Sequence, residues 1–336
     1  MNLEAILDSV FVFDRYGDLL HLLQNSIWAG ALIGLVGGMI GTFVMMRDMA
    51  FSVHGIAELS FAGGAIALLV GADIVTGSLM GSVVAAVIIG IVGAQSRESN
   101  SVVGVLMPFG LGIGILALAL YQGRTANRFA LLTGQIVSVD EVQLVSMAIL
   151  SAVVIAGLLV IWRPLSFAST DPAVARARGL PVRALSLAFM LLLGIAVALS
   201  VQIIGALLVL ALLISPAAAA MNLSASPVKI VVLSVVFAEV SMVGGILLAL
   251  GGALPISPYV TTISFLIWVL SWILRRTRSR PRSSAARDGA GATGGGPGEG
   301  EDDDRSTRSG VHSSTGSAAG RTVMVTGSSP SGSPSA

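Results

Sequence analysis

Two ionisable side chains, His54 and Glu58, stand four residues apart in an otherwise apolar stretch of the sequence. Residues at this spacing lie on one face of a helix, so the imidazole and the carboxylate are expected to be neighbours. Both groups suit a divalent transition metal, so the pair could hold or pass a cation. An ion pair at a helix end explains the same two residues equally well.

Glu239 and Gln202 are further polar candidates in apolar surroundings. Glu239 lies in the middle of VVLSVVFAEVSMVGG, and an acid there is expected to face a helix interface or a water-filled path. A structural hydrogen bond to a neighbouring helix is the alternative. Gln202 is predicted at a short turn between two apolar segments, where it could line an ion pathway or simply satisfy backbone groups.

The elements that must position these residues are membrane-spanning helices. Of the 336 residues, 54% are hydrophobic and 11% are charged. Soluble domains carry about 25% charge, so the composition argues against a soluble enzyme and against a basic nucleic-acid binder. A span needs about 20 apolar residues. About nine segments qualify, and eight to ten are compatible with the pattern. They are 23–46, 57–75, 77–96, 102–121, 142–162, 185–202, 205–222, 230–250 and 259–274.

The sequence thus predicts an all-α, polytopic transmembrane bundle with three regions. Residues 1–22 mix acids with Leu, Val and Phe and are expected to form an interfacial helix. Residues 23–276 form the transmembrane domain. Residues 277–336 are a Gly/Ser-rich tail that cannot bury a core and is expected to be disordered.

Basic residues predict the orientation in the cytoplasmic membrane. If nine spans alternate, one side receives only three of the loop residues, namely Arg15, Arg124 and Arg128. The other side receives Arg47, Arg97, the basic residues of 163–184, Lys229 and the tail from Arg275. Because basic loops stay in the cytoplasm, we expect the N-terminus outside and the C-terminus in the cytoplasm.

Glycines recur in the first span at helical spacing. Gly30, Gly34 and Gly38 are four residues apart, as are Gly37 and Gly41. Small residues at this spacing let helix backbones approach closely in lipid, so tight packing of this span is predicted.

Two absences in the sequence restrict the chemistry. The chain has no cysteine, so it has no disulfide, thiolate metal site or cysteine nucleophile. Its single lysine, Lys229, follows a valine, whereas the phosphate-binding P-loop needs a lysine after glycine. We therefore expect no ATPase and no other enzymatic activity in this chain.

The loop 163–184 contains the pattern of a short helix. Ser169-Thr170-Asp171 precedes Pro172, as at a helix start, and Gly179 follows AVARAR, as at a helix end. Such a helix on the cytoplasmic side could dock a soluble partner. An ordinary basic loop is the alternative.

Several segments together resemble the permease subunit of zinc, manganese and iron ABC importers. The resemblance runs from about Tyr16 to Arg276. The matching pieces are AGALIGLVGGMIGTFVMMRDMAFS, FGLGIGILAL, LLTGQIVSV, TDPAVARARGLPVRAL and VQIIGALLVLALLISPAAAA. The resemblance implies a homodimeric permease with an extracellular metal-binding lipoprotein and a cytoplasmic ATPase dimer. It implies no cofactor in this chain, because the ATPase uses the ATP.

The same resemblance assigns a coupling helix, which would fit a groove on the ATPase. The residues that it implies for this role are Asp171, Pro172, Ala175, Arg176, Arg178, Gly179 and Leu180.

One departure from the family concerns the candidate metal pair. Members commonly show G-D-x-x-S-H-x-x-x-P-G after the first span. With the final glycine on Gly63, the Asp falls on His54, the His on Glu58 and the proline on Ala62. The spacing is kept while acid and imidazole are exchanged, so His54 and Glu58 stay the candidate metal ligands.

The sequence therefore predicts an ABC importer permease for zinc, manganese or iron. An ABC permease for a metal chelate, such as a siderophore or haem, is the nearest alternative. Two further alternatives are a secondary transporter driven by an ion gradient, which would use acids near the membrane midplane, and a membrane scaffold without transport. A scaffold would not need Glu239 or the loop helix.

Overall fold

The computed structural model describes residues 23–93, 99–123, 139–206, 208–249 and 256–278. These residues form helices and no strand. Eight of the helices are long and apolar enough to cross a membrane, and a ninth, α11, is shorter. The helices are α3 (Gln24–Met46), α4 (Ala50–Val70), α5 (Ile74–Gly93), α6 (Ser99–Leu120), α8 (Glu141–Thr170), α9 (Pro172–Ala177), α10 (Val182–Ile204), α11 (Val209–Leu223), α12 (Pro227–Ala249) and α13 (Ile256–Arg278).

This architecture confirms the predicted all-α membrane bundle. The predicted N-terminal interfacial helix and the C-terminal tail lie outside the described residues, apart from the tail's first two residues at the end of α13. With 15 residues, α11 spans about 22 Å, less than the hydrocarbon core. The predicted count of about nine therefore corresponds to eight long helices and one short one.

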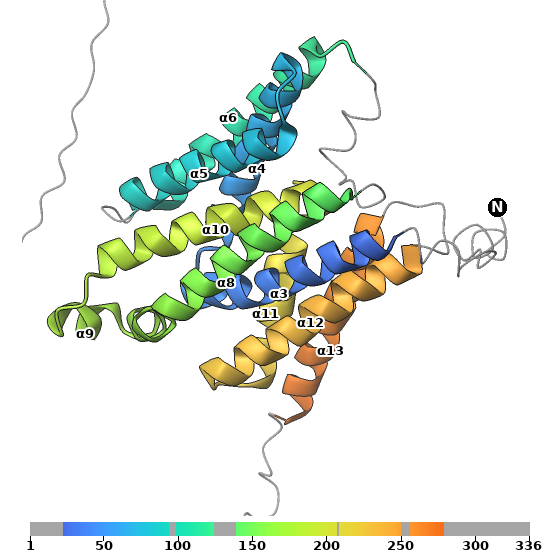
Figure 1. Cartoon of the computed structure of the whole chain (residues 1–336). Helices are drawn as coiled ribbons and strands as arrows, with labels where there is room; N and C mark the ends of the chain where they lie inside the picture. The colour runs from blue at the N-terminus through green and yellow to red at the C-terminus, as the bar shows by residue number, and fades with distance from the viewer. Residues whose placement is uncertain (1–22, 94–98, 124–138, 207, 250–255, 279–336) are drawn as a thin grey trace, which may run out of the picture. The chain divides into compact units, whose positions relative to one another are not determined.

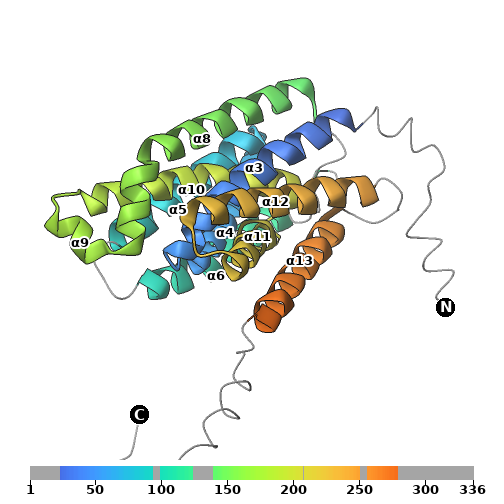
Figure 2. The same ribbon diagram turned by 90° about the horizontal axis from the view of Figure 1, so that it is seen from below.

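Three helices, α3, α4 and α10, form the centre of the bundle. Two-thirds of the spanning residues of each are buried, whereas fewer than a third of those of α6, α8 and α13 are buried. α4 packs against α5 and α6, and α12 packs against α3, α11 and α13 (Figure 1 and Figure 2). α10 contacts α5, α8, α4 and α3 and so joins the two groups. The exposed apolar faces of the outer helices suit lipid or a second copy of the chain.

The glycines of α3 bring two helices close to it, as predicted. A methyl group on Gly38 would lie 2.6 Å from the Cα of Val235 in α12. One on Gly41 would overlap the carbonyl oxygen of Leu213 in α11. One glycine face of α3 therefore holds α12 and the other holds α11, at separations that a larger residue would not allow.

The two tightly spaced spans predicted within 57–96 are separate helices. Gly71 ends α4 with a φ of 74°, in the left-handed region where glycine is favoured. Asp73 then accepts a hydrogen bond from the backbone N–H of Thr76 at 2.9 Å, as a residue before a helix start does. A three-residue link therefore reverses the chain between the two spans.

Two predicted boundaries were wrong. α4 starts at Ala50 rather than at residue 57, so His54 and Glu58 lie within the helix and not at its beginning. α8 continues to Thr170 rather than ending at residue 162. Hydropathy marks only the lipid-facing part of a helix, whereas the backbone hydrogen bonding continues into the polar interface, even across Pro164.

Candidate ion pathway and coupling helix

His54 and Glu58 are neighbours on one face of α4, as their spacing predicts. His54 Nε2 lies 3.8 Å from Glu58 Oε1, which is within ion-pair range but too long for a hydrogen bond. The Glu58 side chain is 3% exposed and that of His54 is 21% exposed. His54 Nδ1 and Glu58 Oε2 are enclosed and have no hydrogen-bond partner among the described residues. The pair therefore retains lone pairs that a cation could use.

The pair does not form a complete metal centre with other side chains of this chain's described part. No group of three or more His, Cys, Asp or Glu residues is close enough there to hold a metal ion. Two protein ligands suit a site through which a metal passes, because water or backbone carbonyls can complete the coordination and leave again.

Glu239 lies on another helix, against α3. A methyl group on Gly34 would stand 3.1 Å from the Glu239 carboxyl carbon, so the carboxylate packs over this glycine. Nearby, Ser234 Oγ donates a 2.8 Å hydrogen bond to the carbonyl of Gly38. The structure thus places Glu239 at the α3–α12 interface, apart from His54 and Glu58, since α4 and α12 share no extensive contact.

Gln202 lines a cavity of about 690 Å³ at the end of α10, which we call the Gln202 cavity. Asp73, Asp140 and Gln143 also line it. Gln202 Oε1 is enclosed without a hydrogen-bond partner in the described ranges. The hydrogen bonds from the side chain and backbone of Thr76 keep the pKa of Asp73 below its ordinary value. This cavity therefore holds oxygen ligands and negative charge at the end predicted to face outward.

The predicted loop helix is present as α9, between α8 and α10. Asp171 accepts hydrogen bonds from the N–H groups of Ala173 and Val174, both at 3.0 Å, and Pro172 occupies the first turn. At the other end Gly179 has a φ of 80°, and Leu180 N–H donates to the carbonyl of Ala175 at 3.1 Å. Capping at both ends stabilises a helix that has only six residues.

α9 presents a cationic surface. Ala175 is its only buried residue, whereas Arg176 and Arg178 are exposed. The guanidinium of Arg178 lies over the ring of Phe167 at 5.6 Å, and Arg176 Nε donates to the carbonyl of Pro172 at 3.1 Å. These contacts orient both arginines, so the helix offers an ordered positive face.

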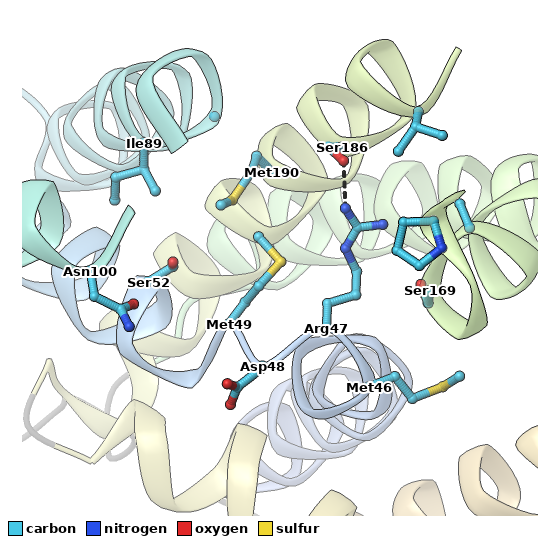
Figure 3. Close-up of a pocket in the computed structure, with 14 residues that line it drawn as sticks. Met46, Arg47, Asp48, Met49, Ser52, Ile89, Asn100, Ser169, Ser186 and Met190 are labelled. Carbon is cyan, nitrogen blue, oxygen red and sulfur yellow. Dashed lines mark hydrogen bonds between the residues drawn. The ribbon is translucent and has the colours of Figure 1, made fainter. Parts of the chain in front are cut away.

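In the sequence, Arg47 was counted only among the basic loop residues that predict orientation, and its burial in a cavity was not predicted. The residue follows α3 and lines a second cavity, of about 520 Å³, at the opposite end of α10 from the Gln202 cavity (Figure 3). We call it the Arg47 cavity. Its only sequence signal is an arginine in the three-residue link between two spans. The enclosure itself comes from α8, α9 and α10, which lie more than 100 residues away.

A family model described as the ABC 3 transport family matches residues 20–275, which include every described helix except the last three residues of α13. The chain belongs to the ABC 3 transport family. This agrees with the resemblance seen between about Tyr16 and Arg276, and the membrane bundle of this family member is that of a transport protein.

Relatives of this ABC 3 family member include proteins named for metal transport. The manganese transport system membrane protein MntC of Halalkalibacterium halodurans is 30% identical over 237 residues, 70% of this chain and 81% of the relative. The high-affinity zinc uptake system membrane protein ZnuB of Haemophilus influenzae is 22% identical over 259 residues, 77% of this chain and 99% of the relative.

The fold of this family member also matches a solved structure, that of PsaBC from Streptococcus pneumoniae in complex with Fab. The TM-score is 0.70 at 24% sequence identity, and the match covers 78% of this chain and 95% of the other. This likeness extends over nearly the whole of that chain and shows that the two share a fold.

Proposed function

We propose that the chain is the permease subunit of an ABC importer that moves a divalent transition metal across the cytoplasmic membrane. The observation that carries this proposal is the family match across the helical bundle, together with relatives named for manganese and zinc transport. Manganese, zinc and iron are the candidate substrates, and manganese is tested first because the 30% identical relative is named for it.

His54 and Glu58 are the proposed ligands on the metal path. Their unpartnered nitrogen and oxygen atoms and the burial of Glu58 support this role. Burying an acid in a membrane helix costs free energy, so such an acid usually marks a functional site. The Gln202 cavity, at the predicted outer end of α10, is where the metal would first meet the chain. Glu239 is a second candidate for the path, from the α3–α12 interface.

α9 is the proposed coupling helix, with Asp171 to Leu180 contacting a cytoplasmic ATPase. Its capped ends and its ordered arginines support this role. ATP binding and hydrolysis would take place in that separate subunit, and α9 would transmit its movement through α8 and α10, against which it packs.

The proposed assembly contains two copies of this chain, an ATPase dimer and an extracellular metal-binding lipoprotein. The exposed apolar faces of the outer helices support association with a second copy in lipid. The orientation that suits this assembly is the one predicted from the basic residues, with the N-terminus outside and the C-terminus in the cytoplasm.

Metal uptake in cells tests the proposal. A strain without its own manganese, zinc and iron importers receives the chain with its cognate ATPase and extracellular metal-binding lipoprotein, and radiolabelled uptake of each metal is measured. We expect uptake of at least one of the three. The matched control carries the same chain with a catalytically inactive ATPase and should show none. Unchanged uptake of all three metals on adding the active pair would contradict the proposed function.

A further inference from the structure

The Arg47 cavity contains a positive charge that nothing in the described part of the chain balances. Arg47 Nη2 donates to Ser186 Oγ, and the guanidinium lies over the ring of Phe189 at 5.6 Å. Nε and Nη1 are enclosed and have no hydrogen-bond partner among the described residues. An enclosed guanidinium with two free N–H directions is costly, and an anionic group in the cavity would relieve that cost.

The acidic neighbour in the sequence does not serve this purpose. Asp48 lines the same cavity, yet it forms no ion pair with Arg47 in the described ranges. Its carboxylate points away from the guanidinium (Figure 3). Asp48 adopts a φ of 54°, a left-handed conformation that closes the short link between α3 and α4 and that aspartate tolerates better than most residues.

The walls of the cavity indicate what kind of anion it fits. Met46, Met49 and Met190 give one part of the wall a soft apolar surface, and Ser52 and Asn100 give another part polar groups. A free, hydrated anion needs several donors around it, whereas a carboxylate on an alkyl stem uses both kinds of wall. Arginine makes strong charge-assisted hydrogen bonds to a carboxylate, and the N–H groups of its Nε and Nη1, which point in different directions, remain free here.

The cavity opens beside the proposed coupling helix. Ser169 and Pro172, at the junction of α8 and α9, belong to its lining. The exposed side chains around this junction are cationic, namely Arg176 and Arg178, whereas Asp171 is engaged at the start of α9. A partner that contacts α9 would therefore cover the mouth of the cavity, and charge complementarity requires it to be acidic there.

We propose that the Arg47 cavity is a socket for an acidic side chain of the cytoplasmic ATPase. This inference rests on the proposed function, because it needs that ATPase as the partner of α9. The carboxylate enters between α3, α8 and α10 and pairs with Arg47. Docking is thereby linked directly to α3 and to the start of α4, the helix that carries His54 and Glu58.

The affinity of the full-length permease for its purified ATPase tests the socket. Arg47→Gln removes the charge and is expected to weaken binding at least about tenfold, as loss of one partner of a buried charge pair does. The matched control is Arg183→Gln, which removes an exposed arginine near the start of α10 that does not line the cavity. It should change the affinity less than about twofold. Wild-type affinity in Arg47→Gln would overturn the inference.

Two further experiments distinguish an acidic side chain of the ATPase from other anions that could occupy the cavity. Glu98, which lies outside the described residues, precedes α6, and Glu98→Gln tests a partner within the chain; a loss equal to that of Arg47→Gln would overturn the inference. Inorganic phosphate tests a free anion. Stabilisation of the isolated wild type by phosphate but not of Arg47→Gln, with unchanged ATPase affinity, would also overturn it.

A second measurement does not depend on how well Arg47→Gln folds. Because the chain has no cysteine, Met49→Cys places a single thiol in the cavity wall. The ATPase should slow its labelling by a small maleimide at least about tenfold, by excluding the reagent from the filled socket. Ser226→Cys, at an exposed turn between α11 and α12, is the unprotected control. Equal labelling of Met49→Cys with and without bound ATPase would overturn the inference. If the wild type binds no ATPase, the proposed function fails together with it.

Discussion

At the scale of single residues, the candidate metal pair is notable for atoms that have no hydrogen-bond partner among the described residues. The 3.8 Å separation between His54 and Glu58 is too long for a hydrogen bond, and each side chain keeps one enclosed atom without a partner among the described residues. A purely structural pair in lipid would be expected to close to hydrogen-bond distance, because an unsatisfied polar atom in this environment costs free energy. The geometry therefore favours a ligand-binding role for these two residues.

Glu58→Gln keeps the shape of the side chain and removes its negative charge. If the carboxylate lines the metal path, the initial rate of metal uptake should fall at least about tenfold, since an amide is a much weaker cation ligand. Glu141→Gln, which changes an exposed acid at the start of α8, is the matched control and should transport normally. Uptake is measured in cells that contain equal amounts of each variant. Normal uptake by Glu58→Gln would show that His54 and Glu58 form a structural pair and do not line the metal path.

Asp73 predicts a dependence of stability on pH. Hydrogen bonds from Thr76 lower the pKa of Asp73 in the folded protein below its ordinary value of 3.8. The charged form is therefore favoured by folding, so its stabilising effect is complete well above pH 3.8 and is lost as the pH falls through the lowered pKa. Thermal unfolding of the wild type and Asp73→Asn should differ at neutral pH and converge in strong acid. A difference that grows on acidification would contradict this assignment.

Residue spacing predicted part of the site and not the rest. The four-residue interval between His54 and Glu58 is sufficient by itself to place both side chains on one face of a helix. Arg47 gave no comparable signal, because enclosure of an arginine depends on α8, α9 and α10 folding over it. Contacts between residues so far apart in sequence cannot be derived from local periodicity.

At the scale of the elements, the helix contacts depend on glycines. α3 approaches α11 and α12 so closely that the space for a methyl group at Gly41 is already taken by the carbonyl oxygen of Leu213. Lipid gives no hydrophobic drive for helices to associate, so this close packing is the main source of cohesion between them.

Gly41→Ala should destabilise the bundle by about 2 kcal/mol or more, because the added methyl group pushes backbone against backbone. Gly112→Ala is the matched control, since nothing lies within 4 Å of the position where its methyl group would stand. It should leave the stability within about 0.5 kcal/mol, the range for a surface change. Thermal unfolding in detergent compares the two. Equal melting temperatures would show that the α3–α11 approach is not needed for stability.

Asp171→Ala should impair coupling while leaving the membrane bundle folded. The side chain caps α9 through two backbone N–H groups, and loss of such a cap costs about 1 kcal/mol. Asp171→Asn keeps the cap and is the control. The measurement is stimulation of the ATPase by purified permease, which should fall for the alanine variant and stay for the asparagine variant. If both variants stimulate equally, the capped helix is not what couples the subunits.

Element boundaries were predicted less well than element types. The nine apolar segments gave the order of the apolar helices, eight long and one short, because an apolar segment of about 20 residues is needed to span the hydrocarbon core. The start of α4 was missed, since its first residues include Ser52 and His54 and so read as a loop. The short helix α9 was found because Asp171, Pro172 and Gly179 act locally, through caps that sequence alone reveals.

At the scale of the whole molecule, the helical bundle is that of a transport family, and the proposed function adds a separate ATPase subunit. Membership of the ABC 3 transport family accounts for the spanning helices, and the single lysine, which follows valine rather than glycine, agrees with ATP use in another subunit. Two cavities lie at opposite ends of α10, one rich in oxygen ligands and one around Arg47. The proposed metal pair lies on α4, a central helix that packs against α10.

Transport in a purified system tests this account most directly. The permease and its ATPase are reconstituted into liposomes with the extracellular binding protein on the outside, and the accumulation of manganese, zinc and iron is followed with and without internal ATP. The account predicts accumulation that requires ATP and is lost with Glu58→Gln, while ATP hydrolysis continues. Hydrolysis without accumulation of manganese, zinc or iron by the wild-type protein would contradict it.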